Sequence, residues 1–241
     1  MKYAILGDIH ANLEALQAVL EDAGKEKVTH YACIGDVVGY AANPKECLDI
    51  VRKLDCPIVK GNHDEMAASS EDPVYFHPDA SRAIKWTREQ LSEENRHWLD
   101  NMKMVRYVEG FTMVHASLDA PGKWTYVLDK LTAAFSLNQQ RTAVCFHGHT
   151  HRPCVFTRDG SAVKGSLFER IHVNPSLRYF INVGSIGQPR DGNPLAAYVI
   201  YNVWDEEIIL KRLPYDIRKA QEKIMAAGLP QKCATRLAVA K

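Results

Sequence analysis

The first residues of the chain, MKYAILGDIHANLEALQAVLEDAG (Met1–Gly24), join a short apolar run, a polar loop and an amphipathic segment. Residues 2–6 predict a strand, and residues 12–23 predict a helix because their apolar positions recur at helical spacing. These positions are Leu13, Leu16, Val19 and Leu20. Asn12 is placed to cap this helix and Gly24 to end it. The chain therefore opens with a strand, a loop and a helix.

Further strand and helix signals follow in the first half of the chain. HYACIG (residues 30–35) predicts a second strand, and NPKE (residues 43–46) is a strong helix start, with a capping residue, a proline and a glutamate in order. PIVK (residues 57–60) predicts a third strand, and residues 81–91 and 93–102 predict a two-helix insertion after it.

From residue 111 onward, runs of β-branched and aromatic residues alternate with turn signals. The runs cover residues 111–115, 142–147, 153–157, 178–183, 196–203 and 206–213. A final helix is expected over residues 216–227, ending at Gly228. Strands and helices that alternate first and then give way to strands predict an α/β fold of two packed sheets with helices outside.

Composition narrows the class of protein. A chain of 241 residues can form a single α/β domain over residues 1–241. Its formal net charge of +1 provides no overall attraction for nucleic acid or an anionic membrane. The six cysteines form no CxxC pair, and the first apolar run is too short for a signal peptide or a membrane span. We therefore expect a cytoplasmic protein with no membrane partner, whose oligomeric state the sequence leaves open.

Carboxylates and histidines cluster where the expected strands end. They lie in GDIH (7–10), GDVV (35–38), GNHD (61–64), VHAS (114–117) and GHTH (148–151). In open α/β sheets the loops at the carboxyl ends of strands share one crevice. On extended backbone His149 and His151 would also point to the same side, as metal ligands do. Ordinary hydrogen-bonded histidines are the alternative.

The order of these five segments resembles the signature of the calcineurin-like metallophosphoesterase superfamily, whose members are binuclear metal phosphohydrolases. GDVVGYAANPKEC (35–47) and NVGSIGQPRDG (182–192) also resemble a small bacterial and archaeal branch that is related to diadenosine tetraphosphatases. The resemblance implies a four-layer sandwich of two mixed sheets flanked by helices.

The resemblance also implies two divalent metal ions that share the carboxylate of Asp36. The ligands of the first ion would be Asp8, His10, Asp36 and His151, and those of the second Asp36, Asn62, His115 and His149. Oxygen and imidazole ligands suit Mn, Fe, Co, Ni or Zn. Two such ions leave the site cationic, so that it would attract a phosphoryl oxygen and hydrolyse small phosphodiesters or phosphomonoesters with a metal-activated hydroxide.

His63 is left without a metal in this pattern and would act as general acid or as a donor to the phosphate. Asp64 could orient its ring. The chain departs from the serine/threonine phosphatases, which carry an aspartate and an arginine in GDxVDRG where this sequence has Gly39 and Tyr40. A phosphoprotein phosphatase is therefore disfavoured, and a different group must clamp the phosphate.

Arg190, Arg152 and Asn12 are candidates for this clamp, the last because a helix start favours anions. A solvated arginine or a plain helix cap is the alternative for each. His147 lies outside the motif and is expected to form part of the wall.

Other functions remain open. A dinucleoside polyphosphate hydrolase or a nuclease would use the same centre, although the absence of a basic stripe disfavours long nucleic acid. A non-catalytic protein-binding scaffold of the same fold would have lost ligands, whereas every position implied here is intact. The expected partner is a small phosphoester.

Overall fold

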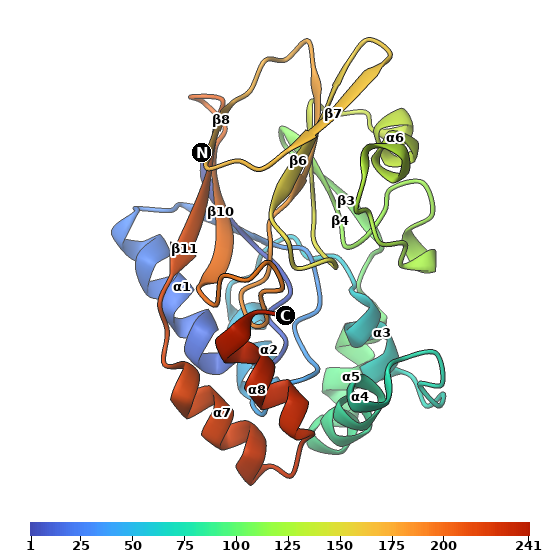
Figure 1. The fold of residues 1–241 in the computed structure, drawn as a ribbon, viewed down its shortest axis with the longest axis vertical. Coiled ribbons are helices and arrows are strands. Elements are labelled where there is room, and N and C mark those ends of the chain that lie inside the picture. The colour runs from blue at the N-terminus through green and yellow to red at the C-terminus, as the bar shows by residue number, and fades with distance from the viewer.

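Two mixed β-sheets form the centre of the molecule, as the computed structural model of residues 1–241 shows (Figure 1). The first sheet has the order β2-β1-β10-β11-β8, with bounds His30–Cys33, Lys2–Leu6, Ala196–Asn202, Glu207–Leu213 and Arg170–His172. The second has the order β3-β4-β5-β9-β6-β7, with bounds Val105–Val108, Phe111–Val114, Val144–His147, Arg178–Asn182, Cys154–Asp159 and Ala162–Ser166. Parallel pairs join β1 to β2 and β4 to β5 to β9, and the other pairs are antiparallel.

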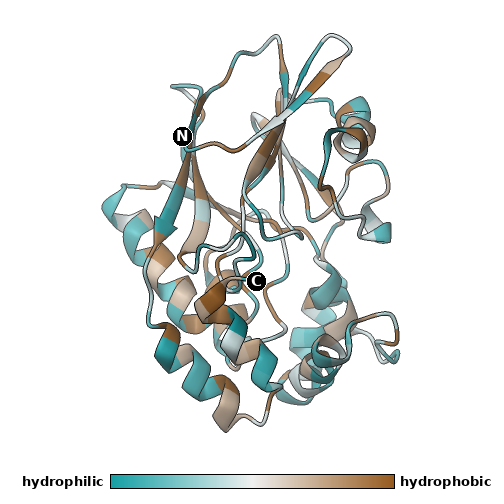
Figure 2. Ribbon diagram, viewed as in Figure 1, coloured by the Kyte–Doolittle hydropathy of each residue, from teal (hydrophilic) through white to brown (hydrophobic).

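Helices cover the outer faces and one end of the sheets, which confirms the expected α/β architecture (Figure 1). Their bounds are Leu13–Lys25 (α1), Pro44–Lys53 (α2), Asn62–Ala68 (α3), Pro78–Gln90 (α4), Glu93–Asp100 (α5), Lys130–Gln139 (α6), Ile217–Ala226 (α7) and Gln231–Val239 (α8). Helix α1 packs on β10 and α6 packs on the second sheet. Hydrophobic and hydrophilic residues lie on different sides of helices such as α7 (Figure 2). None of the helices is long and apolar enough to cross a membrane.

The period of two along a strand divides the core into layers. On β10, Tyr198 and Ile200 belong to the apolar cluster under the helices, whereas Val199 and Tyr201 belong to the cluster between the sheets. Phe146 of the second sheet packs edge to face against Tyr201. Both faces of the first sheet are thus buried, and the strand ends are the place where polar side chains can gather.

Several expected elements differ from the structure. Residues 57–60 make only the isolated bridges Cys33↔Ile58 and Val59↔Lys103, so the expected third strand is wrong. The run is too short to continue pairing because the chain turns into α3 directly after it. Gly24 does not end α1, which continues to Lys25.

The helix after β11 is not the last one. A further helix, α8, begins directly after Pro230, so the expected final helix is followed by another. The helices α3 and α6 and the strands β3, β7 and β8 were not predicted from the sequence. Since most residues of β3, β7 and β8 are exposed or half-buried, these short strands lack the apolar pattern that marks a strand.

Candidate metal centre

Four loops meet where the strands of the two sheets end. Asp8 follows β1, Asp36 follows β2 and His115 follows β4 directly, while the segment after β5 carries His149 and His151. These side chains are buried. Together with His10 they form two groups, and within each group the candidate ligand atoms all lie within 4.8 Å of one another.

Left-handed backbone marks this region. Positive φ angles, between 48° and 67°, occur at Asp8, His10, Asp36, His149 and His151. Residues other than glycine seldom adopt this conformation, and where they do so in clusters the surrounding structure holds them at functional sites. The expectation that extended backbone aims His149 and His151 at one point is therefore wrong. Strand β5 ends at His147, and the two histidines enter different groups.

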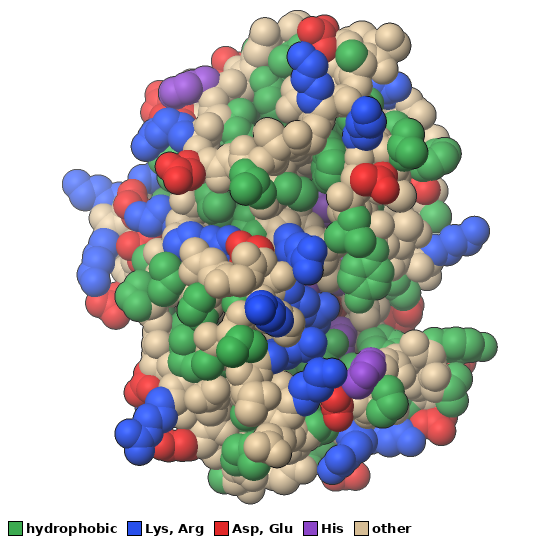
Figure 3. Space-filling model, viewed as in Figure 1, with side chains coloured by type: hydrophobic (Ala, Val, Ile, Leu, Met, Phe, Trp, Pro, Cys, Tyr) green, Lys and Arg blue, Asp and Glu red, His purple; other side chains and the backbone are tan.

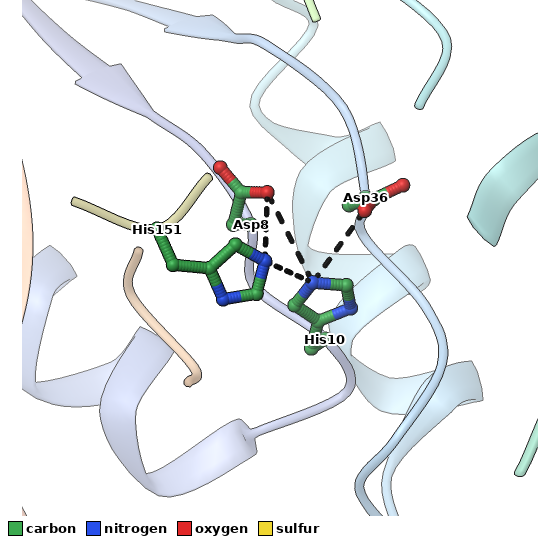
Figure 4. A group of neighbouring side chains, drawn as sticks. All are labelled: Asp8, His10, Asp36 and His151. Carbon is green, nitrogen blue, oxygen red and sulfur yellow. Dashed lines mark hydrogen bonds and ion pairs between the residues drawn. The ribbon is translucent and has the colours of Figure 1, made fainter. Parts of the chain in front are cut away.

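The first group consists of Asp8, His10, Asp36 and His151 (Figure 4). The Nε2 atom of His151 lies 3.2 Å from Oδ1 of Asp8, and Nε2 of His10 lies 3.5 Å from Oδ2 of Asp36. The two Nε2 atoms are 3.1 Å apart. Two imidazoles and two carboxylates from three loops thus converge on one small volume.

Hydrogen bonds at Nδ1 fix the tautomer of the His10 and His151 rings. His10 Nδ1 lies 3.1 Å from the carbonyl of Val38, and His151 Nδ1 lies 2.6 Å from that of Gln188. Burial lowers the pKa of both rings well below its ordinary value, so each ring is neutral and donates from Nδ1. Only a lone pair is left at each Nε2. The two Nε2 lone pairs point towards each other and lie beside the carboxylates of Asp8 and Asp36. Without a cation they repel each other, whereas a bound cation would be coordinated by all four groups.

The second group consists of Asp36, His115 and His149. His115 donates from Nδ1 to the carbonyl of Ile34 at 2.8 Å, and its Nε2 lies 3.4 Å from Oδ2 of Asp36. The Oδ1 atom of Asn62 lies 3.2 Å from the same Nε2. The buried Nε2 of His149 has no hydrogen-bond partner. Asp36 belongs to both groups, as a ligand shared by two ions must.

Asp36 and His115 form a buried pair of opposite charges, and each charge shifts the pKa of the other group. Burial lowers the pKa of His115, but the Asp36 carboxylate outweighs burial and raises it to about 9. Burial raises the pKa of Asp36, yet His115 and the other histidines hold it well below its ordinary value. A proton therefore occupies the pair in the absence of a cation, and a metal ion would replace that proton.

Two glycines allow the backbone to approach the carboxylates. A Cβ atom at Gly61 would lie 2.1 Å from Oδ1 of Asp36, and one at Gly148 would lie 2.2 Å from Oδ2 of Asp8. The amides that follow donate to these groups: His63 N to Asp36 Oδ1 at 2.8 Å, and the amide of His149 to both oxygens of Asp8 at 3.1 Å. Only glycine fits at these positions, which explains the GN and GH pairs of the motif.

The ring of His63 lies beside the first group. Its centroid is 4.8 Å from that of His10, 4.5 Å from that of Tyr40 and 5.2 Å from that of Phe76. Its Nδ1 is buried without a partner. Burial lowers the pKa of His63 to about 4. Aromatic side chains therefore hold this ring, and sequence reasoning missed both Tyr40 and Phe76 because an aromatic residue in a loop carries no pattern.

Asp64 does not orient His63, so that expectation is wrong. Its Oδ1 accepts from the amides of Val37 and Val38 at 2.9 and 3.3 Å, and its Oδ2 accepts from the amide of Gly61 at 3.1 Å. In the first turn of α3 the carboxylate turns back towards free backbone donors. Asp64 therefore ties the start of α3 to the loop of Asp36.

Asn12, a candidate for the phosphate clamp because it lies at a helix start, uses its side chain for structural hydrogen bonds. Its Oδ1 accepts from the amide of Ala15 at 3.2 Å, and its Nδ2 donates to the carbonyl of Gly187 at 2.9 Å. Asn12 is the N-cap of α1, as the sequence predicts, and both ends of the buried amide group are engaged in this way.

Arg190 remains available as a ligand for an anion. It makes no ion pair, because the neighbouring Asp191 pairs with Arg212 instead. Its guanidinium lies 5.6 Å from the centre of the Tyr40 ring, and its backbone N–H donates to the carbonyl of His151 at 3.2 Å. The loop that carries Arg190 is thus attached directly to the first ligand group.

Two other residues named from the sequence have structural contacts. Arg152 donates from Nε to the carbonyl of Arg190 at 3.0 Å. His147 stacks on Phe180 with 4.0 Å between the ring centroids and belongs to neither ligand group. Tyr126 lies beside the second group, and its ring centroid is 4.2 Å from that of His149.

Comparisons with known proteins agree with this geometry. Residues 1–206 match the family model described as the calcineurin-like phosphoesterase superfamily domain. The chain is 38% identical over 240 residues to an uncharacterized protein of Methanocaldococcus jannaschii, covering 97% of this chain and 96% of that one. The crystal structure of a metallophosphoesterase from Sphaerobacter thermophilus covers 100% of both chains with a TM-score of 0.89 and 36% identity. A hypothetical protein from Pyrococcus horikoshii has the same fold, with a TM-score of 0.81 at 19% identity and coverage of 100% and 98%. The chain therefore belongs to the calcineurin-like phosphoesterase superfamily.

Proposed function

We propose that this protein is a binuclear metal-dependent phosphoesterase that hydrolyses small phosphodiesters or phosphomonoesters. The observation that supports it best is the pair of buried ligand groups that share Asp36, in which His10, His149 and His151 are neutral imidazoles. Such a set is costly to bury and serves no packing purpose without a cation.

The ligands would divide between two ions. Asp8, His10, Asp36 and His151 would hold the first, and Asp36, Asn62, His115 and His149 the second. Neutral imidazoles and hard oxygens together suit Mn, Fe, Co, Ni or Zn. When bound, two such ions would supply an activated water at neutral pH and offset the negative charge of the phosphoryl group.

The residues around the centre have distinct tasks. His63 would donate a hydrogen bond or a proton to the oxygen that leaves, from a ring position fixed by Tyr40 and Phe76. Arg190, free of carboxylates, would bind a non-bridging phosphate oxygen.

Metal content and turnover test this function together. Emission spectroscopy of the purified protein should give two transition metal ions per chain, and the manganese-loaded protein should hydrolyse bis-p-nitrophenyl phosphate. A chelator should abolish turnover, and added manganese should restore it. A metal-loaded protein that is inert towards phosphodiesters and phosphomonoesters alike would instead support the binding scaffold of the same fold.

A further inference from the structure

A basic pocket adjoins the candidate metal centre. It has a volume of about 190 Å³, and its polar lining includes Tyr40, Asp79, Tyr126, Arg190, Lys232 and Arg236. Two of these residues also form the wall of the centre: the ring of Tyr40 lies 4.8 Å from that of His10, and the ring of Tyr126 lies 4.2 Å from that of His149. The pocket is therefore separated from the metal ligands by a single layer of side chains.

The charges of this basic pocket are unbalanced. Arg190, Lys232 and Arg236 are three cations against the single carboxylate of Asp79, in a chain whose formal net charge is only +1. None of the three cations forms an ion pair with an aspartate or glutamate, and Arg236 donates from Nε to the main-chain oxygen of Lys241 at 2.9 Å. Lys and Arg side chains gather in the middle of this face of the molecule, close to histidine (Figure 3).

Two of the cations share one neutral partner. Arg190 Nη2 and Arg236 Nη1 both donate to Oε1 of Gln188, at 2.8 and 3.2 Å. Gln188 is buried, and its Nε2 has no hydrogen-bond partner. Arg190 Nε is buried and unpaired as well. Half-buried guanidinium groups that meet at one amide oxygen repel each other, and an anion between them would remove that cost.

The size of the pocket selects among anions. Its volume corresponds to several water molecules at about 30 Å³ each, so that it accommodates a phosphate group. It lies below the range of roughly 300 to 1,000 Å³ typical of whole-ligand sites. A guanidinium pair presents planar, parallel N–H groups that match phosphate oxygens.

The cations beyond Arg190 come from a separate part of the chain. Lys232 and Arg236 lie on α8, whereas the match to the superfamily domain ends at residue 206. Two of the three cations thus come from α8, whereas Tyr40, Asp79, Tyr126 and Arg190 come from the part of the chain that matches the superfamily domain.

We propose that the basic pocket binds a second phosphate of the same substrate while the first phosphate lies at the metal centre. This proposal rests on the proposed phosphoesterase function. The substrate class is then a phosphoester that carries at least two phosphates, and α8 provides the selectivity. Arg236 and Lys232 would contact only the second phosphate, whereas Arg190 stands between the two positions.

A matched pair of substrates tests the selectivity. The p-nitrophenyl ester of thymidine monophosphate and the same ester with a second phosphate on its sugar share the leaving group and differ in one anion. The ratio of their kcat/KM values, measured with the manganese-loaded protein, should favour the doubly phosphorylated ester. Arg236→Gln and Lys232→Gln should each lower this ratio about tenfold, the size of a lost charge-assisted hydrogen bond. Asp79→Asn should raise it.

Arg218→Gln is the matched control, because Arg218 is an exposed arginine of α7 paired with Glu222 and its loss changes the net charge equally. This variant should keep the wild-type ratio. If Arg236→Gln or Lys232→Gln also keeps it, or if Arg218→Gln lowers it to the same extent, the proposal is overturned. Lys232 is exposed and holds no structure together, so this arm does not depend on the folding of the Arg236 variant.

Binding of pyrophosphate to the metal-free chain separates the two proposals. Without metals the centre lacks the cations that would attract a phosphate, and the proton on the Asp36–His115 pair only offsets the charge of Asp36, so calorimetry reports on the basic pocket. Pyrophosphate should bind to the wild type and about tenfold more weakly to Arg236→Gln. Absence of turnover with pyrophosphate binding intact would contradict only the phosphoesterase function, and absence of binding to the wild type would contradict the pocket.

Discussion

Replacement of Asp36 should reduce the metal content more than replacement of any other ligand, since its carboxylate is the only one common to both ligand groups. Asp36→Asn removes the charge that would offset the repulsion between two cations. We expect both metals to be lost together, as measured by emission spectroscopy after dialysis. Asp8→Asn is the control, because Asp8 belongs to the first group only and should weaken one ion. Two metals and full activity in Asp36→Asn would show that the ligand is not shared.

His63 should act on the chemical step and not on metal binding. His63→Ala is expected to leave metal content unchanged and to lower kcat by about 10² to 10⁴, the usual worth of a positioned proton donor. Since p-nitrophenolate scarcely needs a proton, the loss should be smaller for p-nitrophenyl esters than for alkyl esters. His97→Ala, an exposed histidine of α5, serves as the control. Equal losses for both kinds of ester would mean that His63 only binds phosphate.

Arg190 should affect the binding of substrate. Arg190→Ala is expected to raise KM for phosphoesters about tenfold, or about 1.4 kcal/mol, with metals retained. Arg152→Ala is the comparison, because Arg152 reaches the same loop only through the carbonyl of Arg190. Unchanged KM and kcat in Arg190→Ala would assign this arginine to the structure of the loop.

Prediction from sequence was most successful for residues that a motif marks and least successful for their hydrogen-bond partners. Asp8, Asp36 and the histidines of GHTH come together as the strand ends predict. Asp64 stands next to His63 in the sequence, yet its carboxylate faces the amides of Val37 and Gly61. Which donor a side chain finds depends on a backbone segment that lies far away along the chain, and no local pattern reports it.

At the scale of the elements, the loop between β2 and α2 shapes the environment of His63. Gly39 has a φ of 93°, and a Cβ atom there would lie 2.4 Å from Nδ1 of His63. Gly39→Ala should therefore displace the ring, lower kcat and reduce stability by roughly 1 to 2 kcal/mol through the left-handed conformation.

A matched glycine separates strain from displacement. Gly110 has a φ of 92° in the turn between β3 and β4, and its nearest contact for a Cβ atom is a side-chain methyl at 3.3 Å. Gly110→Ala should lower the melting temperature to a similar extent without changing kcat. If the two variants have equal kcat values, the close approach of Gly39 to His63 has no catalytic role.

The elements that sequence predicted are those with a buried face. Strands β10 and β11 and helix α1 have apolar positions at the proper period because they pack against the core. Strand β7, AVKGS, has no buried residue and pairs only with β6, so nothing in its composition marks it. Residues 57–60 are apolar enough for a strand, but their place in the chain leaves room only for isolated bridges.

For the molecule as a whole, bound metal should contribute to stability. Asp8, Asp36 and Asp64 lie close together and are almost fully buried, and in each case burial opposes the charged form. Ions that bind only the folded state at a hundred times their Kd would add about 2.7 kcal/mol. Chelation should then lower Tm by roughly 5 to 10 °C for a chain of this size, as followed by calorimetry. Asp36→Asn should show a much smaller shift, and an unchanged wild-type Tm would contradict the metal site.

The layered architecture was predictable, whereas the strand order was not. Alternation of strands and helices indicates two sheets with helices outside, and the structure has them. The central places are taken by strands from late in the chain: β10 lies beside β1, and β9 lies between β5 and β6. Strands that are far apart in the sequence pair according to which strand edges are still unpaired in the folding chain. Because the sequence of each strand is compatible with several neighbours, the order could not be predicted.

The pairing of β1 with β10 also has a consequence for biosynthesis. On the ribosome, β1 can pair with β2 early, but its other edge must wait for Ala196–Asn202 to be translated. At about 5 to 20 residues per second this edge stays open for roughly ten seconds or longer. An unpaired, apolar strand edge readily joins another chain. The nascent protein is therefore exposed to aggregation through this edge until β10 has been translated and has paired with β1.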